Sequence, residues 1–301
     1  MLASPDIVAA RYRSEIRQEI RALGTQLKVV GFLGGDYAPS LTYSNYTRNA
    51  CEELGIVYEV RQVHRLELER AIVAANQDSS VHGIMVYYPV FGNEQDRYLK
   101  DVVDPRKDIE GLHSFWIRKL YQNERLVAGA RAAGKSVVPC TALAILKILE
   151  ANGGYGASGT RPAEHKTVTI FNRSEVVGRP LAVMMSNDGA RIYSFDEQGP
   201  LLYQDGEATE TQISRAEALR QSDMVITGVP SRNFPKIEAA ELPPHTICLN
   251  FATIKNFTPD AEEKAELFVP RVGPVTVAMC MRNTLRLYRT YFAADRDAEV
   301  V

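Results

Sequence analysis

The chain has 301 residues, of which 45% are hydrophobic and 24% are charged, and its formal net charge at pH 7 is -2. This composition is typical of globular proteins, and the length suits two domains. The near-neutral charge argues against a protein that binds nucleic acid or anionic membranes through a large basic surface.

Single residues and short segments exclude further classes of protein. The cysteines are scattered without a CxxC pair, so reduced thiols are expected rather than a disulfide framework or a zinc site. The five histidines have no metal-ligand spacing, and no metal is expected. No apolar run approaches the roughly 20 residues of a transmembrane helix. Acidic residues interrupt the N-terminal arginines, unlike a transit peptide, and a cytoplasmic location is expected.

Hydrophobic spacing predicts alternating helices and strands in the first half of the chain. The predicted elements are an amphipathic helix near 7–23, a strand at 27–33, a helix at 40–54, a strand at 56–63, a helix at 66–76, a strand at 81–88 and a long helix from 139. Strands and helices that alternate at this spacing indicate parallel βαβ units.

The alternation restarts after a glycine-rich loop at 153–166. The predicted elements are strands at 167–171, 191–195, 224–227 and 246–250, a helix at 180–187 and a last helix at 277–291. We interpret segment 198–222 as a loop with a short helix. The expected class is α/β with two domains, and ligands of such folds bind beyond the carboxyl ends of the strands.

The segment 167–180 has the order strand, polar turn and helix, which is typical of a nucleotide-binding turn. Gly178 lies where the helix begins, and Pro180 suits its first turn. Free backbone N–H groups and the positive helix end would favour a pyrophosphate there. Because no GxGxxG motif is present, an ordinary βα turn explains the pattern equally well.

The next predicted strand ends at Asp196, 18 residues after Gly178 (196 − 178). An acidic residue about 20 positions on binds the ribose hydroxyls of NAD and repels the 2′-phosphate of NADP. Asp196 would therefore favour NAD, although it also suits the role of a cap for the loop after the strand. Further on, Thr227, Gly228, Val229 and Pro230 follow an apolar strand. Their backbone allows a flat ring to approach closely, or it simply forms a tight turn.

Seven segments in fixed order carry a resemblance to a known family. They are SLTY (40–43), VHGIMVYYPV (81–90), PRKDIEG (105–111), VVPCTALAILKILE (137–150), FNRSEVVGRPLA (171–182), TGVPS (227–231) and RVGPVTVAMCMRNTLRL (271–287). Together they resemble the methylenetetrahydrofolate dehydrogenase/cyclohydrolase family nearly from end to end. The resemblance implies a folate-binding αβ domain of residues 1–150 with a returning last helix (277–301). It also implies a Rossmann domain of residues 151–276, NAD as cofactor and a homodimer.

The same resemblance implies residue roles for the substrate. Tyr43 matches the tyrosine that packs over the aromatic system of the folate, and Glu110 matches the acid that holds the pterin. Gly273, Pro274 and Thr276 match the loop that lines the folate cleft. The cofactor turn of the family is matched by Arg173, Ser174, Val177 and Gly178.

Two departures bear on the reaction. The lysine that lies four residues after the tyrosine in the bifunctional enzymes is Thr47 here, and its supporting glutamine is Tyr87. Arg48 would point about 100° away around a helix. These departures resemble the monofunctional, NAD-dependent branch of the family. Cyclohydrolysis needs a positioned acid/base group, which threonine cannot supply, whereas hydride transfer mainly needs correct placement of the two reactants.

The sequence therefore predicts NAD-dependent oxidation of 5,10-methylenetetrahydrofolate to 5,10-methenyltetrahydrofolate without cyclohydrolase activity. Two alternatives stay open: a bifunctional enzyme in which Arg48 or another group replaces the lysine, and a non-catalytic protein that binds folate or a dinucleotide. Single residues also have plainer interpretations. Tyr43 suits a helix surface, Glu110 suits a solvated charge run with Lys107 and Asp108, Gly273-Pro274 suits a turn, and Cys140 suits a buried packing position.

Overall fold

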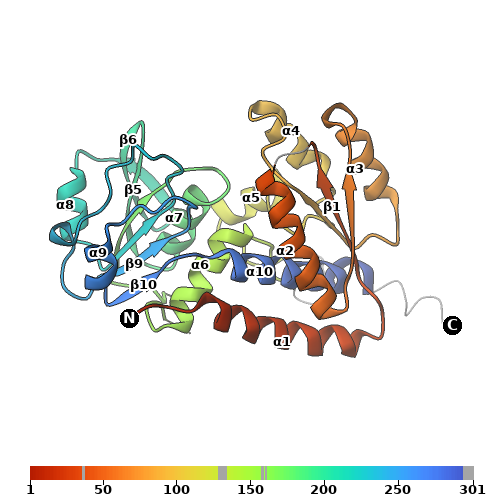
Figure 1. Ribbon diagram of the computed structural model, residues 1–301, viewed down its shortest axis with the longest axis horizontal. Coiled ribbons are helices and arrows are strands. Elements are labelled where there is room, and N and C mark those ends of the chain that lie inside the picture. The colour runs from red at the N-terminus through yellow and green to blue at the C-terminus, as the bar shows by residue number, and fades with distance from the viewer. Residues whose placement is uncertain (36–37, 128–133, 157–158, 160, 294–301) are drawn as a thin grey trace. The chain divides into compact units, whose positions relative to one another are not determined.

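The protein is described by a computed structural model that covers residues 1–35, 38–127, 134–156, 159 and 161–293 (Figure 1). It divides into two compact units, each built on a parallel sheet. The three-stranded unit comprises Ala10–Cys140 and the chain from Val277 onward, and the seven-stranded unit comprises Met1–Ala9 and Thr141–Thr276. The sequence-based boundary at residue 150 differs, because it leaves residues 1–9 and 141–150 with the first domain.

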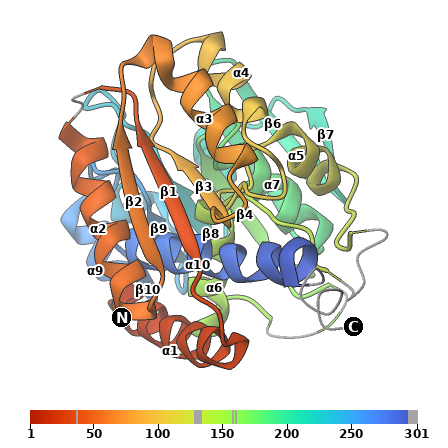
Figure 2. The ribbon, with the colours of Figure 1, turned by 90° about the vertical axis from the view of Figure 1, so that its right-hand side faces the viewer.

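The three-stranded unit has a parallel sheet with the order β2-β1-β3. Its strands are β1 (Lys28–Leu33), β2 (Val57–Gln62) and β3 (Gly83–Val86). Its helices are α1 (Pro5–Leu23), most of which belongs to it, α2 (Ala38–Leu54), α3 (Leu68–Gln77) after a 3-10 turn at Arg65–Glu67, α4 (Glu94–Val102) and α5 (Ser114–Tyr121). Helices α2 and α3 lie on opposite faces of the sheet (Figure 2).

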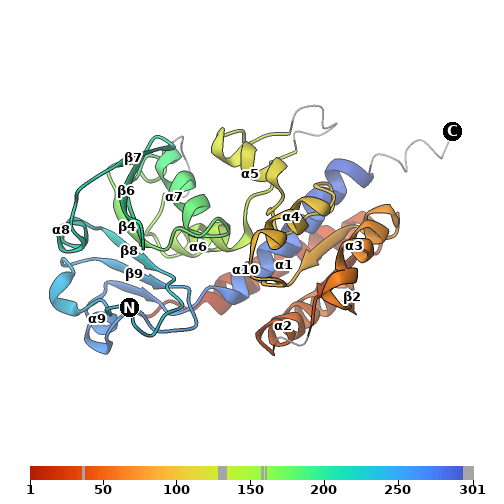
Figure 3. The same ribbon diagram turned by 90° about the horizontal axis from the view of Figure 1, so that it is seen from above.

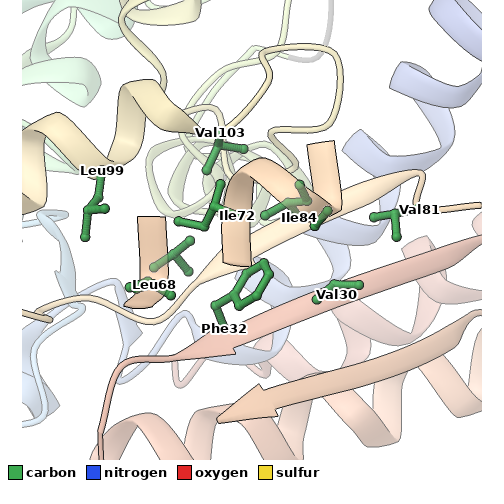
Figure 4. Close-up of a cluster of buried hydrophobic side chains, with 10 residues drawn as sticks. Val30, Phe32, Leu68, Ile72, Val81, Ile84, Leu99 and Val103 are labelled. Atoms are coloured by element: carbon green, nitrogen blue, oxygen red, sulfur yellow. The ribbon is translucent and has the colours of Figure 1, made fainter. Parts of the chain in front are cut away.

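A buried hydrophobic cluster fills the space between this sheet and helices α3 and α4 (Figure 4). Val30 and Phe32 project from β1 toward Leu68 and Ile72 of α3. Because side chains alternate along a strand, Gly31 between them belongs to the other face, which α2 covers. Full burial of each such side chain contributes roughly 1.5–3 kcal/mol. The cluster therefore fixes which strand positions are left to form the α2 face.

The seven-stranded unit is a Rossmann-type sheet with the strand order β10-β9-β8-β4-β5-β6-β7. The first five of these are parallel, and β6 and β7 are antiparallel. The strands are β4 (Thr167–Phe171), β5 (Arg191–Asp196), β6 (Gly199–Gln204), β7 (Glu207–Glu210), β8 (Met224–Thr227), β9 (Ile247–Asn250) and β10 (Leu267–Val269). Between β4 and β8 the strand order reverses, which is where such sheets bind ligands.

Short helices flank this sheet (Figure 3). They are α6 (Cys140–Ala151), α7 (Gly178–Asn187), α8 (Arg215–Arg220), a 3-10 turn (Ala239–Glu241) and α9 (Pro259–Lys264). Helix α7 packs against β4, β5 and β6. Residues of α8, the 3-10 turn and α9 join the buried cluster around Phe171 and Val225.

The last helix, α10 (Gly273–Leu287), continues into a π-helical turn at Tyr288–Phe292. From Val277 onward it belongs to the three-stranded unit, where the Asn283 amide donates to the Ile109 carbonyl oxygen at 3.0 Å. The predicted return of this helix to the first domain is confirmed. Among the described residues, no helix is both long enough and apolar enough to span a membrane.

Segment 198–222 was predicted as a loop with a short helix, and that prediction is wrong for its first half. Strands β6 and β7 form an antiparallel hairpin there, and only α8 is helical. The turn is Asp205-Gly206, and both residues have positive φ, of 49° and 85°. An Asp-Gly pair is the usual signal of such a hairpin turn, and the polar composition of β7 obscured it.

Candidate active site

The predicted catalytic and folate-binding residues of the three-stranded unit lie together on the α2 face of its sheet. The rings of Tyr43 on α2 and Tyr87 after β3 meet edge to face, with centroids 5.9 Å apart and planes at 79°. Thr47 lies one turn further along α2 and is fully buried. Its hydroxyl donates to the Tyr43 carbonyl oxygen at 3.1 Å. Tyr43 therefore faces other site residues and is not a plain surface aromatic.

A residue that the sequence did not single out, Tyr58 of β2, completes this group. Its hydroxyl is hydrogen-bonded to the hydroxyl of Tyr87. Strands β2 and β3 flank β1, so the two phenols meet across the middle strand. Gly31 of β1 makes the meeting possible, because a Cβ there would collide with the Tyr58 hydroxyl. The phenol pair thus depends on a glycine at this one position.

The phenols of this pair are held in their protonated form. Burial raises the pKa of Tyr58 to about 12, and hydrogen bonds with Tyr87 and Ser44 limit the rise. The pKa of Tyr87 is also raised, mainly by burial and then by Tyr58. Arg48 packs its guanidinium over the Tyr58 ring, 5.9 Å from the centroid. At neutral pH the group therefore offers hydroxyls and a permanent cation, and neither is a general base.

Glu110 lies at the edge of the same sheet. One of its carboxylate oxygens, Oε2, accepts a hydrogen bond from the Val86 backbone N–H at 3.1 Å. Burial raises the pKa of Glu110 to about 8, and the neighbouring Asp108 carboxylate adds to the rise. The half-buried carboxyl group is therefore largely protonated at neutral pH in the free protein, and it suits the predicted contact with nitrogen-bound hydrogens of a ligand once it ionises.

The charged run 107–110 is not a solvated surface, because Lys107 and Asp108 are buried. The Lys107 ammonium donates to three backbone carbonyl oxygens at the end of α3, at 2.7 to 3.0 Å. The Asp108 carboxylate accepts from the backbone N–H groups of Glu110, Gly111 and His113. These two residues fix the loop that carries Glu110, so the solvated-run interpretation is wrong.

The predicted buried position of Cys140 is confirmed, since its side chain is 5% exposed. Gly273, Pro274 and Thr276 form the first turn of α10 and not a loop before a helix at 277. Proline is tolerated there because N–H groups of a first turn have no partner within the helix. The hydroxyl of Thr276 donates to the Val272 carbonyl oxygen at 3.3 Å. These three residues group with the seven-stranded unit, whereas Tyr43, Thr47, Tyr87 and Glu110 belong to the three-stranded unit.

The turn after β4 is organised by Asn172, which sequence analysis did not single out. Its side-chain oxygen accepts from the backbone N–H groups of Ser174 and Gly178, at 3.0 and 3.1 Å. The N–H groups of Val177 and Arg179 donate to Ser174 oxygens. The prediction of free N–H groups at this helix end is therefore wrong for Val177, Gly178 and Arg179. Without a GxGxxG backbone, the side chains of Asn172 and Ser174 and the Ser174 carbonyl oxygen accept from these donors.

Gly178 is nevertheless required, because a Cβ would collide with the Asn172 backbone carbonyl. The turn after β8 is held in a similar way. The Asn172 amide donates to the Gly228 carbonyl oxygen at 2.8 Å, which ties the two turns together. Asn256 both accepts from the Val229 N–H and donates to the Val229 carbonyl oxygen.

The remaining residues of the β8 turn are closely packed. Thr227 is fully buried, and its hydroxyl donates to the side-chain oxygen of Asn250 at 3.1 Å. The ring of Phe251 covers Gly228, so that a Cβ at residue 228 would collide with it. Pro230 follows the half-buried Val229 and is exposed. Thr227, Gly228, Val229 and Pro230 thus line one side of the switch point, as Arg173, Ser174, Val177 and Gly178 line the other.

Asp196 ends β5, the strand next to β4, as the sequence predicted. Its Oδ1 accepts from the guanidinium of Arg173 at 2.8 Å and from the Gln198 backbone N–H at 2.8 Å. The Arg173 guanidinium also donates to the carbonyl oxygens of Ser194 and Gly199, at 2.6 and 2.5 Å. Asp196 therefore caps the following loop, and it also presents a carboxylate beside the switch point. Its contact with the ribose of NAD stays a prediction.

Comparisons with known proteins agree with this geometry. Residues 5–110 match the family model of the tetrahydrofolate dehydrogenase/cyclohydrolase catalytic domain. A Dictyostelium discoideum protein named methylenetetrahydrofolate dehydrogenase [NAD(+)] is 45% identical over 93% of this chain and 92% of its own length. The Saccharomyces cerevisiae protein of the same name is 43% identical over 87% of this chain and 86% of its own. The chain belongs to the tetrahydrofolate dehydrogenase/cyclohydrolase family.

The solved structure of the NAD-dependent 5,10-methylenetetrahydrofolate dehydrogenase from Saccharomyces cerevisiae has the same fold. It superposes with a TM-score of 0.89 and 38% identity, and 96% of each chain is covered. The fold class predicted from the sequence, a two-domain α/β protein of this family, is confirmed.

For a member of the tetrahydrofolate dehydrogenase/cyclohydrolase family, the surroundings of Thr47 are the main departure. The position that matches the lysine of the bifunctional enzymes holds a buried threonine, and the phenol pair Tyr58–Tyr87 lies beside it. These hydroxyls keep their protons near neutral pH, since the pKa values of both phenols are raised. The group can therefore orient a bound molecule by hydrogen bonds but cannot readily exchange protons with it.

Sequence reasoning missed Tyr58, Gly31, Asn172 and Asn256. A glycine inside a predicted strand signals a close approach by another group, which could have pointed to Gly31. An asparagine directly after a strand, as at Asn172, is a frequent turn residue. Nothing local marks Tyr58 or Asn256. Within the described part of the chain, no three histidine, cysteine, aspartate or glutamate side chains are grouped so that they could hold a metal ion.

Proposed function

We propose that this protein oxidises 5,10-methylenetetrahydrofolate to 5,10-methenyltetrahydrofolate with NAD, and that it has no cyclohydrolase activity. The observation that carries the proposal is the similarity, over nine-tenths of its length, to a relative named as an NAD-dependent methylenetetrahydrofolate dehydrogenase. The residues around Thr47 support the second part, because the position of the family lysine holds no amine.

The folate is proposed to contact the residues that match the folate-binding residues of the family. Tyr43 offers an aromatic ring for stacking, and Glu110 offers a carboxyl group for the nitrogen-bound hydrogens of the pterin. The first turn of α10, with Gly273, Pro274 and Thr276, is proposed as a further lining. Burial raises the pKa of Glu110 to about 8, and hydrogen bonds from such donors would lower it again, because they stabilise the ionised form.

The residues at the switch point fit a dinucleotide. Asp196 presents a carboxylate at the end of β5, where the ribose hydroxyls of NAD are bound in such sheets. The turns with Gly178 and Gly228 are tied together by Asn172, which fixes the surface that the cofactor would meet. NAD, when bound, supplies an acceptor for a hydride from the folate methylene carbon. The charge of Asp196 disfavours NADP because it repels the 2′-phosphate.

The substrate itself provides the electronic driving force of the oxidation. A lone pair on the adjacent folate nitrogen stabilises the carbon as the hydride leaves, so no protein base is required. The protein must place the carbon against the acceptor and exclude water. A Thr47 hydroxyl and two protonated phenols are compatible with these tasks. The homodimer and the cytoplasmic location are part of this proposal and rest on the resemblance and the sequence alone.

Absorbance of NADH tests the proposal directly. The protein is mixed with 5,10-methylenetetrahydrofolate and either NAD or NADP, and an acid step then converts any formyl product back to the methenyl form. We expect turnover with NAD and no extra methenyl signal after acidification beyond the control without enzyme. Extra signal would establish a bifunctional enzyme. Binding of both ligands without NADH formation would replace the enzyme assignment by a binding protein.

A further inference from the structure

Asn283 of α10 is a fully buried polar residue whose side-chain hydrogen bonds leave its own helix. Its neighbours Met281 and Leu285 on the same helix are buried apolar residues. The Asn283 amide nitrogen donates to the Ile109 carbonyl oxygen at 3.0 Å and to the Cys140 sulfur at 3.2 Å. No described residue donates to the amide oxygen. A turned amide would bring that oxygen against the Ile109 carbonyl oxygen, so the two donor contacts fix the side chain.

Packing alone does not explain an amide at this position. A buried acceptor without a partner loses its hydrogen bonds to water, and an apolar side chain of the same size would avoid that loss. The next residue, Thr284, is a buried polar group whose needs are met within the helix, because its hydroxyl donates to the Cys280 carbonyl oxygen at 3.1 Å. The Asn283 amide instead reaches a segment 174 positions earlier in the chain. Its contribution therefore concerns that segment.

The segment that Asn283 holds carries Glu110. The carbonyl oxygen that accepts from Asn283 belongs to the peptide bond between Ile109 and Glu110. The Cys140 thiol donates to the same oxygen at 3.2 Å, and the Cys140 backbone N–H donates to the Glu110 carbonyl oxygen at 3.2 Å. The Asp108 carboxylate accepts from the Glu110 N–H at 3.0 Å. The backbone of Glu110 is thus held on both sides, and Asn283 ties it to the last helix.

We propose that Asn283 is a positioning residue for the substrate, which holds the Ile109 carbonyl oxygen and thereby aims the Glu110 carboxyl group at the pterin of the folate. The inference rests on the proposed function, because it takes Glu110 as a folate contact. A hydrogen bond weakens steeply when its angle or length departs from the favoured geometry. A small rotation of the peptide bond between Ile109 and Glu110 would therefore weaken folate binding.

Asn283→Leu tests this role with a side chain of similar size that cannot donate a hydrogen bond. The dissociation constant of tetrahydrofolate, measured by isothermal titration calorimetry, should rise about 3- to 10-fold, the effect of one neutral hydrogen bond. The KM for 5,10-methylenetetrahydrofolate should rise with it. The KM for NAD should stay the same, because the residues proposed to contact NAD belong to the seven-stranded unit.

Thr284→Val is the matched control. It removes a buried hydroxyl from the same helix, but the hydrogen bond that is lost lies within that helix. The folate constants should therefore stay unchanged, and thermal midpoints of all variants report on folding. If leucine at residue 283 prevents folding, Asn283→Ala takes its place, because alanine leaves space and cannot clash.

A double-mutant cycle with Glu110→Ala separates positioning from packing. If Asn283 acts through the Glu110 carboxyl group, Asn283→Leu should change the tetrahydrofolate dissociation constant of Glu110→Ala by less than about twofold. A full 3- to 10-fold effect in that background would overturn the proposal, and so would an unchanged constant in Asn283→Leu alone. An equal effect of Thr284→Val would also overturn it, since that pattern indicates altered packing of α10.

The outcome for Asn283 can be separated from the outcome for the proposed function, because binding of tetrahydrofolate does not require turnover. If the wild-type protein turns over with NAD while Asn283→Leu binds tetrahydrofolate normally, only the inference fails. If the wild-type protein binds tetrahydrofolate without turnover, the proposed function fails and the cycle still decides the role of Asn283. A wild-type protein that neither turns over nor binds tetrahydrofolate would overturn both.

Discussion

The two candidate half-sites of this protein are built in different ways. On the α2 face of the three-stranded unit, aromatic and hydroxyl side chains such as Tyr43, Tyr58 and Tyr87 form the surface. At the switch point of the seven-stranded unit, the surface is mainly backbone, held in place by the amides of Asn172 and Asn256. A surface of side chains can change its chemistry by substitution while its backbone stays the same. A surface formed by the backbone cannot change its chemistry in this way, because its function depends on its shape.

This comparison explains where the chain departs from the bifunctional members of its family. The departures at Thr47 and Tyr87 fall in the side-chain surface, and Tyr58 fills the space there over Gly31. The glycines at 178 and 228 remain, and each lies where a Cβ would collide with a neighbour. When the two surfaces are built in these different ways, loss of cyclohydrolase activity with retention of dehydrogenase activity is the expected result.

The largest effect should come from a methyl group in the backbone surface. In Gly178→Ala the new Cβ meets the backbone carbonyl of Asn172, which cannot move without distortion of β4. We expect the free energy of unfolding to fall by about 3 kcal/mol, the upper range for overpacking, with a raised KM for NAD. Gly228→Ala is the matched comparison, because the atoms nearest to its Cβ belong to the side chain of Phe251 and not to the backbone. Urea denaturation of both variants should rank Gly178→Ala as the more damaging. Equal losses in the free energy of unfolding would show that the backbone neighbour of residue 178 and the side-chain neighbour of residue 228 adjust equally well to the added Cβ.

A smaller effect is expected from the charge beside the switch point. Asp196→Ser removes the carboxylate that repels a 2′-phosphate and releases Arg173 from its ion pair. The ratio of kcat/KM for NADP to that for NAD should rise by about tenfold or more, since even a partly screened unit charge contributes more than 1.4 kcal/mol at contact distance. Glu197→Ser, the exposed neighbour, is the control and should leave the ratio unchanged. The same ratio in both variants would remove Asp196 from the ribose site.

The sequence predicted the frame of both half-sites because local patterns determine it. Strands β4 and β8 begin and end where apolar runs meet turn residues, and both were predicted with their observed bounds. Tyr43 and Thr47 were placed on one helix at a spacing of four, which puts them on one side of α2. Asp196 was found from its spacing to Gly178.

Contacts between distant segments could not be predicted in this way. The Tyr58–Tyr87 pair depends on the register of three strands, because both residues must reach across Gly31. The N–H groups at the start of α7 appeared free in the sequence, since nothing local shows that the Asn172 and Ser174 side chains turn back to them. Asn256 holds Val229 from 27 residues away. Such contacts decide the chemistry of a site whose location the sequence reveals.

Glu110 allows a test of burial on the side-chain surface. Its folded pKa of about 8 lies above the ordinary value of 4.5, so the folded protein keeps a proton that the unfolded chain loses. Stability contributed by this group should therefore fall as pH rises from about 4.5 to about 8, by less than about 1.4 kcal/mol per pH unit. Glu110→Gln should flatten the dependence of the urea midpoint on pH in that window. Exposed Glu263, replaced by glutamine, is the control. Parallel curves for wild type and Glu110→Gln would contradict a buried, protonated Glu110.

The smallest signal is expected from an attempt to reverse the departure at Thr47. Thr47→Lys alone introduces an ammonium group at a fully buried position beside the Tyr58–Tyr87 pair, so the amine has no room to take up a working position. We expect this variant to be less stable and to form no formyl product above the control without enzyme. Thr47→Lys with Tyr87→Gln removes one phenol and returns an amide beside the amine. It should give cyclohydrolase activity at the low end of the roughly 10²–10⁴-fold acceleration that a placed acid/base group contributes. The acid step of the NADH assay measures it.

If the single variant is as active as the double, the phenol pair is no obstacle, and the threonine alone explains the lost activity. If neither is active, the side-chain surface differs from that of the bifunctional enzymes in more than these two residues, and Tyr58, which has no counterpart in the predicted pattern, is the next residue to replace.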